Sequence, residues 1–231
     1  MKPASLFFLI FFWVVLIFDC ALIVSGADEY RYFTKLLLMP LLFGLIASEV
    51  EVTKKWWSVR IISLALVFSL IGDALLINPN ATVFQFMLGI AAFWVVQICY
   101  IFFFYRKRPF RKKDAGFLFF ATLAIFGYLV FLHYLMWPKL DKAHLQIPVI
   151  VYSLTIGFML LCAFNINNSR TLNNMGVLYF IPGAILFVVS DSLIALNKFY
   201  FVKPISGVAI MATYGIAQFL IVMGAIKFIK K

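Results

Sequence analysis

Three aspartates interrupt long runs of apolar residues in this chain, and their positions suggest acid–base chemistry. They are Asp19 in LIFDCALI, Asp73 in LIGDALLI and Asp191 in VVSDSLIA. A carboxylate is costly to place among apolar side chains unless it has a partner or a function. Where two carboxyl groups lie close together in such a site, one can donate a proton while the other stays charged. Asp73 and Asp191 are therefore candidates for a general acid and its charged partner.

The elements that must hold these aspartates are membrane-spanning helices. The composition is 65% hydrophobic with a mean hydropathy of +1.04, and the charged fraction of 13% is about half that of soluble domains. Apolar runs between short polar loops predict helices of about the 17–25 residues that a bilayer requires. We expect an all-α polytopic bundle in which residues 1–231 form one transmembrane domain and the first helix is retained. The eight predicted spans are 3–24, 33–49, 58–77, 83–105, 115–137, 147–166, 174–196 and 205–228.

The distribution of basic residues predicts how these spans are oriented. Fourteen of the twenty Lys and Arg residues fall on the side that holds both termini, which predicts cytoplasmic termini in a cell (inner or plasma) membrane. The RKRPFRKK run at 106–113 is then a cytoplasmic loop, with a contact to lipid headgroups or a protein as an alternative. The net charge of +11 is explained by such loops, so nucleic-acid binding is not expected. The three cysteines and two histidines form no ligand cluster, so no metal site is expected.

The predicted orientation brings several polar side chains to one depth. Helices that are separate in the sequence place these side chains within about 3–8 Å of the outer boundary of the spans. Tyr152 and Ser153 share that level, and Tyr214 lies about one turn deeper. The four ionisable residues in this layer are Asp19, Lys35, Asp73 and Asp191.

Several interpretations of this layer are open. Asp19 and Lys35 lie on consecutive helices and could pair to hold a hairpin together. Asp73 and Asp191 could be protonated hydrogen-bonding groups, part of an ion-coupled transport site, or a catalytic pair. GDALL in the third span also resembles SDSLI in the seventh, and an offset of four spans would suit a duplication.

Five stretches of the chain carry a recognisable pattern. They are TKLLLMPLL (34–42), SLIGDALL (69–76), GIAAFWVVQICYIFFF (89–104), GAILFVVSDSLIALNKF (183–199) and MATYGIAQFLI (211–221). Together they resemble the YhhN-like lysoplasmalogenase family, from the second span to the last, over about four-fifths of the chain. The chain departs from the family at Leu36, where members usually have proline, and at Gln97, where many have histidine.

The resemblance implies an eight-span enzyme that hydrolyses the vinyl-ether bond of lysoplasmalogens. The products would be a fatty aldehyde and glycerophosphoethanolamine or glycerophosphocholine, formed from a lysophospholipid and water in the bilayer without a cofactor. Our hypothesis makes one of Asp73 and Asp191 the general acid and the other the carboxylate that stabilises the cation. Lys35 would receive the substrate phosphate. The remaining candidates for contacts to substrate or water are Tyr214, Gln97, Gln218, Asn197 and Asp19.

Three other functions fit parts of this pattern. A small ion- or proton-coupled transporter would use the same aspartates, although no clearly broken pair of helices is visible. An intramembrane aspartyl protease would need two aspartates, but LIGD lacks the first glycine of the GxGD motif. A hydrolase of another lipid bond, such as an ester, would differ only in its products.

Overall fold

A computed structural model of the chain describes residues 2–50, 55–78, 82–142, 144–169, 172–201 and 207–230. Within these ranges eight helices are long and apolar enough to cross a membrane, and no strand is present. The chain is therefore an all-α, multi-pass integral membrane protein, as predicted. The long helices are α1 Pro3–Ser25, α2 Arg31–Glu49, α3 Trp56–Leu76, α4 Val83–Lys107, α5 Ala115–Lys142, α6 Gln146–Ile166, α8 Ile181–Phe199 and α9 Gly207–Lys230.

The remaining helical segments are short. In the seventh span, three segments follow one another without a break, so that the span runs over Asn173–Phe199. Its middle segment, η3, is a π-helical turn. The short segments are η1 Asp28–Tyr30, η2 Lys112–Asp114, α7 Asn173–Met175 and η3 Gly176–Phe180.

The chain packs as two compact units. Unit 1 consists of Met1–Phe103 and Ile221–Lys231, and unit 2 of Phe104–Leu220. One boundary falls inside α4, after Phe103, and the other inside α9, after Leu220, so GDALL lies in unit 1 and SDSLI in unit 2. The single domain over 1–231 stays a prediction.

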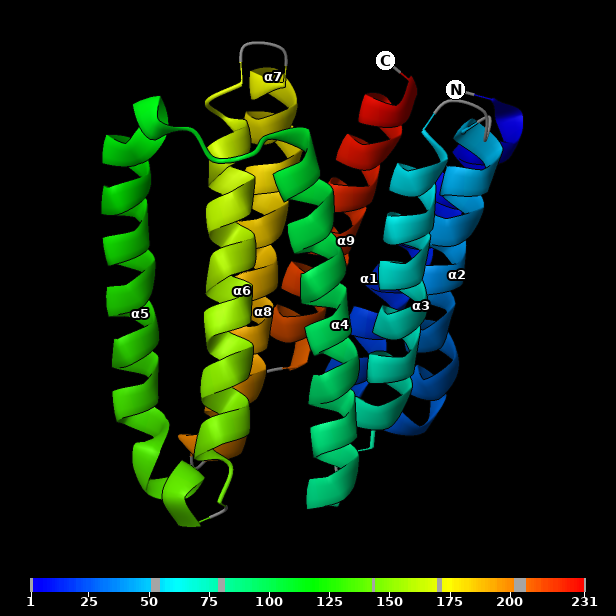
Figure 1. The fold of residues 1–231 in the computed structure, drawn as a ribbon. Helices are drawn as coiled ribbons and strands as arrows, with labels where there is room; N and C mark the ends of the chain where they lie inside the picture. The colour runs from blue at the N-terminus through cyan, green and yellow to red at the C-terminus, as the bar shows by residue number, and fades with distance from the viewer. Residues whose placement is uncertain are drawn as a thin grey trace. The chain divides into compact units, whose positions relative to one another are not determined.

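In unit 1, α2 packs against both α1 and α3 (Figure 1). Phe12, Leu38, Leu42 and Ile62 are fully buried in this packing. Helix α1 ends at Gly26, whose φ of 72° is a left-handed conformation that glycine adopts without steric cost. This turn lets the chain enter η1 and return as α2.

Two glycines in unit 1 allow α3 and α4 to approach closely. A Cβ atom at Gly72 would lie 2.6 Å from Cε2 of Phe93, and one at Gly89 would lie 2.5 Å from Cδ2 of Leu76. Each side chain fills the space that the facing glycine leaves open. The contact at Gly72 fixes the position of the next residue, Asp73.

The two ends of the described chain meet in unit 1. The Lys230 ammonium group forms an ion pair with Glu49, and the Lys2 backbone N–H donates to Glu49 Oε1 at 3.3 Å. Lys55 Nζ donates to the Phe228 carbonyl at 2.8 Å. Both ends therefore lie at the same end of this unit (Figure 1), as an even number of spans requires.

The cytoplasmic location of that end stays a prediction. Part of the charge count on which it depends lies outside the described residues. The basic residues concerned are Lys54, Arg170, Lys203 and Lys231.

In unit 2, α5, α6 and α8 pack against one another (Figure 1). Only 11% of the apolar stretch of the α5 span is buried inside the structure, whereas 39% of the corresponding stretch of α6 is buried. Most of α5 is therefore available to face lipid. The segment that enters α5 is held by Arg108, which is 4% exposed. Arg108 Nη2 lies 2.6 Å from Asp114 Oδ2, and Asn165 Nδ2 donates to the Arg108 carbonyl at 2.7 Å.

Candidate active site

The Asp73 carboxylate on α3 forms an ion pair with Lys35 on α2. Lys35 Nζ lies 3.3 Å from Asp73 Oδ1, and the two side chains are 12% and 2% exposed. Consecutive antiparallel helices place the beginning of α2 beside the end of α3, where these two residues lie. The intramembrane charge of Asp73 is thus compensated within unit 1.

Asp19 on α1 has different partners, so the Asp19–Lys35 pair considered from the sequence is wrong. Thr34 Oγ1 donates to Asp19 Oδ1 at 2.6 Å, and Arg31 Nη2 lies 3.6 Å from Asp19 Oδ2. Arg31 and Thr34 are three residues apart and share one helix face. Lys35 is rotated by about 100° from Thr34, which directs it to α3 instead of α1.

Gln97 on α4 is a fully buried amide in unit 1. Among the described residues, neither its Oε1 nor its Nε2 atom has a hydrogen-bond partner. Leaving a buried polar group without a partner costs about 1–3 kcal/mol, and such groups are uncommon in native proteins. Gln97 is therefore a candidate to bind a water molecule or a polar atom of a substrate.

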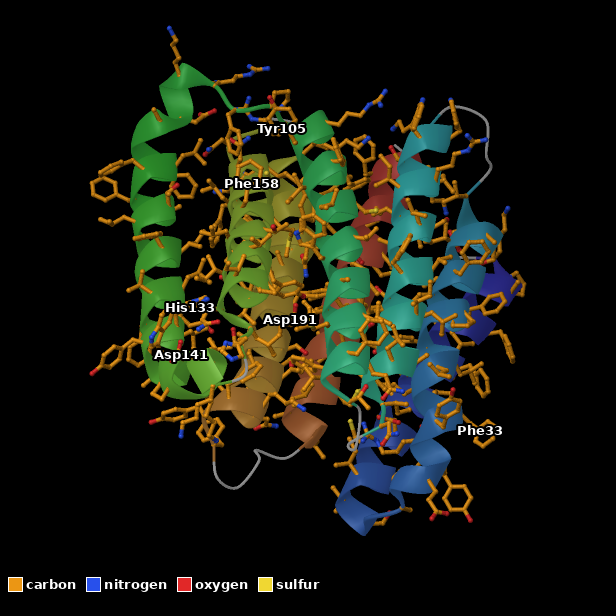
Figure 2. All side chains as sticks on the ribbon, turned by 60° about the horizontal axis from the view of Figure 1, so that its bottom comes forward. Phe33, Tyr105, His133, Asp141, Phe158 and Asp191 are labelled. Atoms are coloured by element: carbon orange, nitrogen blue, oxygen red, sulfur yellow. The ribbon has the colours of Figure 1, made fainter. Side chains whose placement is uncertain are left out.

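Asp191 on α8 is the corresponding carboxylate of unit 2. The Tyr152 hydroxyl on α6 donates a hydrogen bond to Asp191 Oδ2. Tyr152 was expected at the depth of the aspartates but was not among the predicted site residues. Figure 2 labels Asp191 on α8 and His133 and Asp141 on α5.

His133, one of the two histidines that form no metal-ligand cluster in the sequence, lies beside Ser153 in the structure. His133 Nδ1 lies 2.9 Å from the Leu129 carbonyl, and His133 Nε2 lies 3.4 Å from Ser153 Oγ. A carbonyl only accepts hydrogen bonds, so Nδ1 carries a proton, and Nε2 of a neutral ring is an acceptor. The sequence held a signal for this residue. His133 lies four residues before the end of its predicted span, which is the same depth in the membrane as the aspartates.

Three further predicted residues share unit 2 with Asp191. Tyr214 on α9 is 4% exposed and packs edge-on against Phe187, with ring centroids 5.8 Å apart. Gln218 is fully buried one turn further along α9. Asn197 is partly exposed in the last turn of α8.

The predicted site residues are thus divided between the two units. Unit 1 holds Asp19, Lys35, Asp73 and Gln97, and unit 2 holds the other four. The partnership of Asp73 with Asp191 stays a prediction, since the two residues belong to different units. In the part of the chain that the structure describes, no group of three or more His, Cys, Asp or Glu residues could hold a metal ion.

The fold and these contacts define an eight-span membrane protein with intramembrane carboxylates held by a lysine or a tyrosine. The chain belongs to the YhhN family, whose model matches residues 30–225. This match includes Lys35, Asp73 and Asp191 and confirms the resemblance found in the sequence. Asp19 lies outside it.

Curated relatives are similar over most of this chain. Lysoplasmalogenase TMEM86B of Rattus norvegicus is 30% identical over 163 residues, which are 71% of this chain and 60% of the relative. Lysoplasmalogenase of Mycobacterium tuberculosis is 30% identical over 164 residues, 69% of this chain and 58% of the relative. Lysoplasmalogenase TMEM86A of Bos taurus is 34% identical over 172 residues, which are 72% of this chain and 65% of the relative. The chain thus matches about three-fifths of the length of these relatives, and no solved structure matches it significantly.

Proposed function

We propose that this protein is a membrane hydrolase that cleaves the vinyl-ether bond of lysoplasmalogens. The observation that carries the proposal is that relatives named lysoplasmalogenase, from mammals and from mycobacteria, align with about 70% of the chain. The family match includes both intramembrane aspartates of the hypothesis. The substrate would be a lysophospholipid with an ethanolamine or choline head, and the products a fatty aldehyde and the glycerophospho-base.

The reaction needs an acid and a nearby negative charge. A carboxylic acid transfers its proton to the vinyl carbon that is not bonded to oxygen, which leaves an oxocarbenium ion. Water adds to the carbon bonded to oxygen and gives up one proton to a carboxylate. The resulting hemiacetal breaks its bond to the glycerol oxygen, which takes the hemiacetal proton, and the aldehyde is released. Glycosidases use two carboxyl groups for a similar cationic transition state.

The contacts of the two aspartates support different roles for them. Asp73 forms an ion pair with Lys35, which suits the carboxylate that stays charged beside the cation. Asp191 accepts a hydrogen bond from the neutral Tyr152 hydroxyl, which suits the group that gives and regains a proton. The contact with Asp73 also supports a positioning role for Lys35 in preference to the predicted contact with the substrate phosphate.

The test is aldehyde release from lysoplasmenylethanolamine by the purified protein in detergent. Asp73→Asn and Asp191→Asn should each lower the rate at least 100-fold, because general acid–base catalysis typically contributes 10²–10⁴-fold. Asp141→Asn is the matched control, since Asp141 contacts Gln146 in an exposed turn, and it should keep the wild-type rate. Wild-type rates in both intramembrane variants would exclude the proposed mechanism, and no aldehyde from folded wild-type protein would exclude the activity.

One observation favours hydrolysis of a lysolipid ester as a second candidate function. Ser153 Oγ and His133 Nε2 are 3.4 Å apart, and the Leu129 carbonyl orients the imidazole ring. The Ser153 hydroxyl donates to the Ile150 carbonyl at 2.9 Å, so it would have to rotate to give its proton to His133. A hydroxyl beside an oriented base is the arrangement of a nucleophile in ester hydrolysis. Release of fatty acid from an acyl lysophospholipid, lost in Ser153→Ala, would support this candidate. Release of aldehyde alone would exclude it.

A further inference from the structure

Two cavities lie along α5 in unit 2. The first has a volume of about 700 Å³ and is lined from α5, α6 and Tyr200, with His133 and Ser153 among its lining residues. The second has a volume of about 490 Å³ and is lined from α5, α6 and α8. We call the two cavities together the α5 groove.

The two cavities follow one another along the helix. Leu129 lines both of them. From Phe117 in the second cavity to Pro138 in the first, α5 rises by 21 residues, which is about 31 Å. The hydrocarbon core of a bilayer is about 30 Å thick, so the α5 groove follows the helix over the full depth of the core.

Gly157 of α6, which lines the second cavity, lets α5 and α6 approach closely. A Cβ atom there would lie 2.9 Å from Leu129 Cδ1 and 3.0 Å from Ile125 Cγ2. Helices α5 and α6 therefore lie close together at this level. A thin, flexible molecule such as a single hydrocarbon chain fits this shape better than a compact one.

The chemistry of the lining differs between the two cavities. The second cavity is lined by apolar side chains and by Tyr128, whose hydroxyl donates to Ser192 Oγ at 2.8 Å. The first cavity adds polar groups from His133, Ser153, Tyr134 and Tyr200. The groove is therefore apolar along most of its length, and the first cavity carries more of the few polar groups.

The polar contacts of Asp191 lie beside this change in lining. Ser192, which binds Tyr128, follows Asp191 in the sequence. Tyr152, which donates to Asp191, precedes Ser153 of the first cavity. Asp191 itself lines neither cavity; its level in the groove is given by its neighbour Ser192, which accepts a hydrogen bond from Tyr128 of the second cavity.

We propose that the α5 groove binds the substrate lipid, with its hydrocarbon chain in the second cavity and its glycerophospho head in the first. This inference rests on the proposed function, since it places the bond between chain and head at the level of Asp191. Because little of α5 is buried, the chain can enter sideways from the bilayer. His133 and Ser153 then offer polar partners to the oxygen atoms of the head.

The test uses an alkyl-ether lysophosphoethanolamine with a diazirine at the chain end, which binds but cannot be hydrolysed at a vinyl ether. Irradiation of the purified full-length protein should attach the probe to peptides that contain Phe117–Ile125 or Phe164. Ala124→Trp fills the second cavity and should lower this labelling at least 10-fold. Leu123→Trp is the matched control, because Leu123 is 59% exposed and lines neither cavity, and it should label like the wild type.

A shorter probe provides a control for folding. A probe shortened by several carbons should label Ala124→Trp as well as it labels the wild type, because its chain ends before the added indole ring. Labelling only in unit 1, or equal labelling of both tryptophan variants, would overturn the proposal. The probe reports binding without turnover, so labelling without aldehyde release contradicts the proposed function alone, and aldehyde release without labelling contradicts the groove alone.

Discussion

Lys35 Nζ lies 3.3 Å from Asp73 Oδ1, and the pair joins α2 to α3 inside unit 1. The cost of bringing two charges into the membrane is offset only while both are present. Our hypothesis from the sequence assigned Lys35 to the substrate phosphate, but its contact is with the Asp73 carboxylate. The pair therefore has effects on stability and on activity that can be separated.

Removing one charge from this pair should be worse for stability than removing both. Lys35→Met leaves a buried carboxylate unpaired, which costs about 3–5 kcal/mol in buried pairs, and should lower the Tm clearly. Lys35→Met/Asp73→Asn should regain most of that Tm but remain inactive, and Lys35→Arg should keep most of both properties. Thermal unfolding and aldehyde release measure the two effects, and a double variant less stable than Lys35→Met would refute the coupling.

Tyr152→Phe should lower kcat about 10-fold and leave KM nearly unchanged. The variant loses the hydrogen bond to Asp191 but keeps the ring, and a typical hydrogen bond contributes about 0.5–1.5 kcal/mol. Tyr128→Phe is the matched control, because its hydroxyl contacts Ser192 instead, and it should have a smaller effect. Equal kinetics for wild type and Tyr152→Phe would show that this hydroxyl does not position Asp191.

Gln97→Leu should make the protein more stable and less active. The substitution removes a buried amide without partners among the described residues, whose burial costs about 1–3 kcal/mol. The Tm should rise, while aldehyde release falls at least 10-fold. Gln97→His, which introduces the residue that many family members carry, should keep activity. A lower Tm for Gln97→Leu would indicate that the amide has a structural role.

Gly72→Ala should separate α3 from α4 and displace Asp73. The new methyl group would lie 2.6 Å from the Phe93 ring, and such overpacking costs about 1–3 kcal/mol. Both the Tm and the rate of aldehyde release should fall. Adding Phe93→Leu to Gly72→Ala should restore much of the Tm, because the smaller side chain makes room for the new methyl group. A double variant as unstable as Gly72→Ala would contradict this account.

The sequence was sufficient to predict the eight spans, because each is an apolar run of the length that a bilayer requires. It was not sufficient to predict which faces of the helices meet. Thr34 and Lys35 are neighbours in the sequence, yet one contacts α1 and the other α3. His133 lacked a recognisable motif, and its relation to Ser153 depends on how α5 packs against α6. Contacts of this kind depend on helix rotation, which hydropathy does not encode in a chain that is apolar on every side.

The contacts at Glu49 and Lys55 have a consequence for biosynthesis. Their partners, Lys230 and Phe228, belong to the last turns of α9, which are made more than 170 residues after the groups that they bind. The first three spans therefore enter the membrane long before their unit can close. Unit 1 reaches its final packing only when the ribosome has finished α9, so a nascent chain arrested before that point carries Glu49 without its lysine.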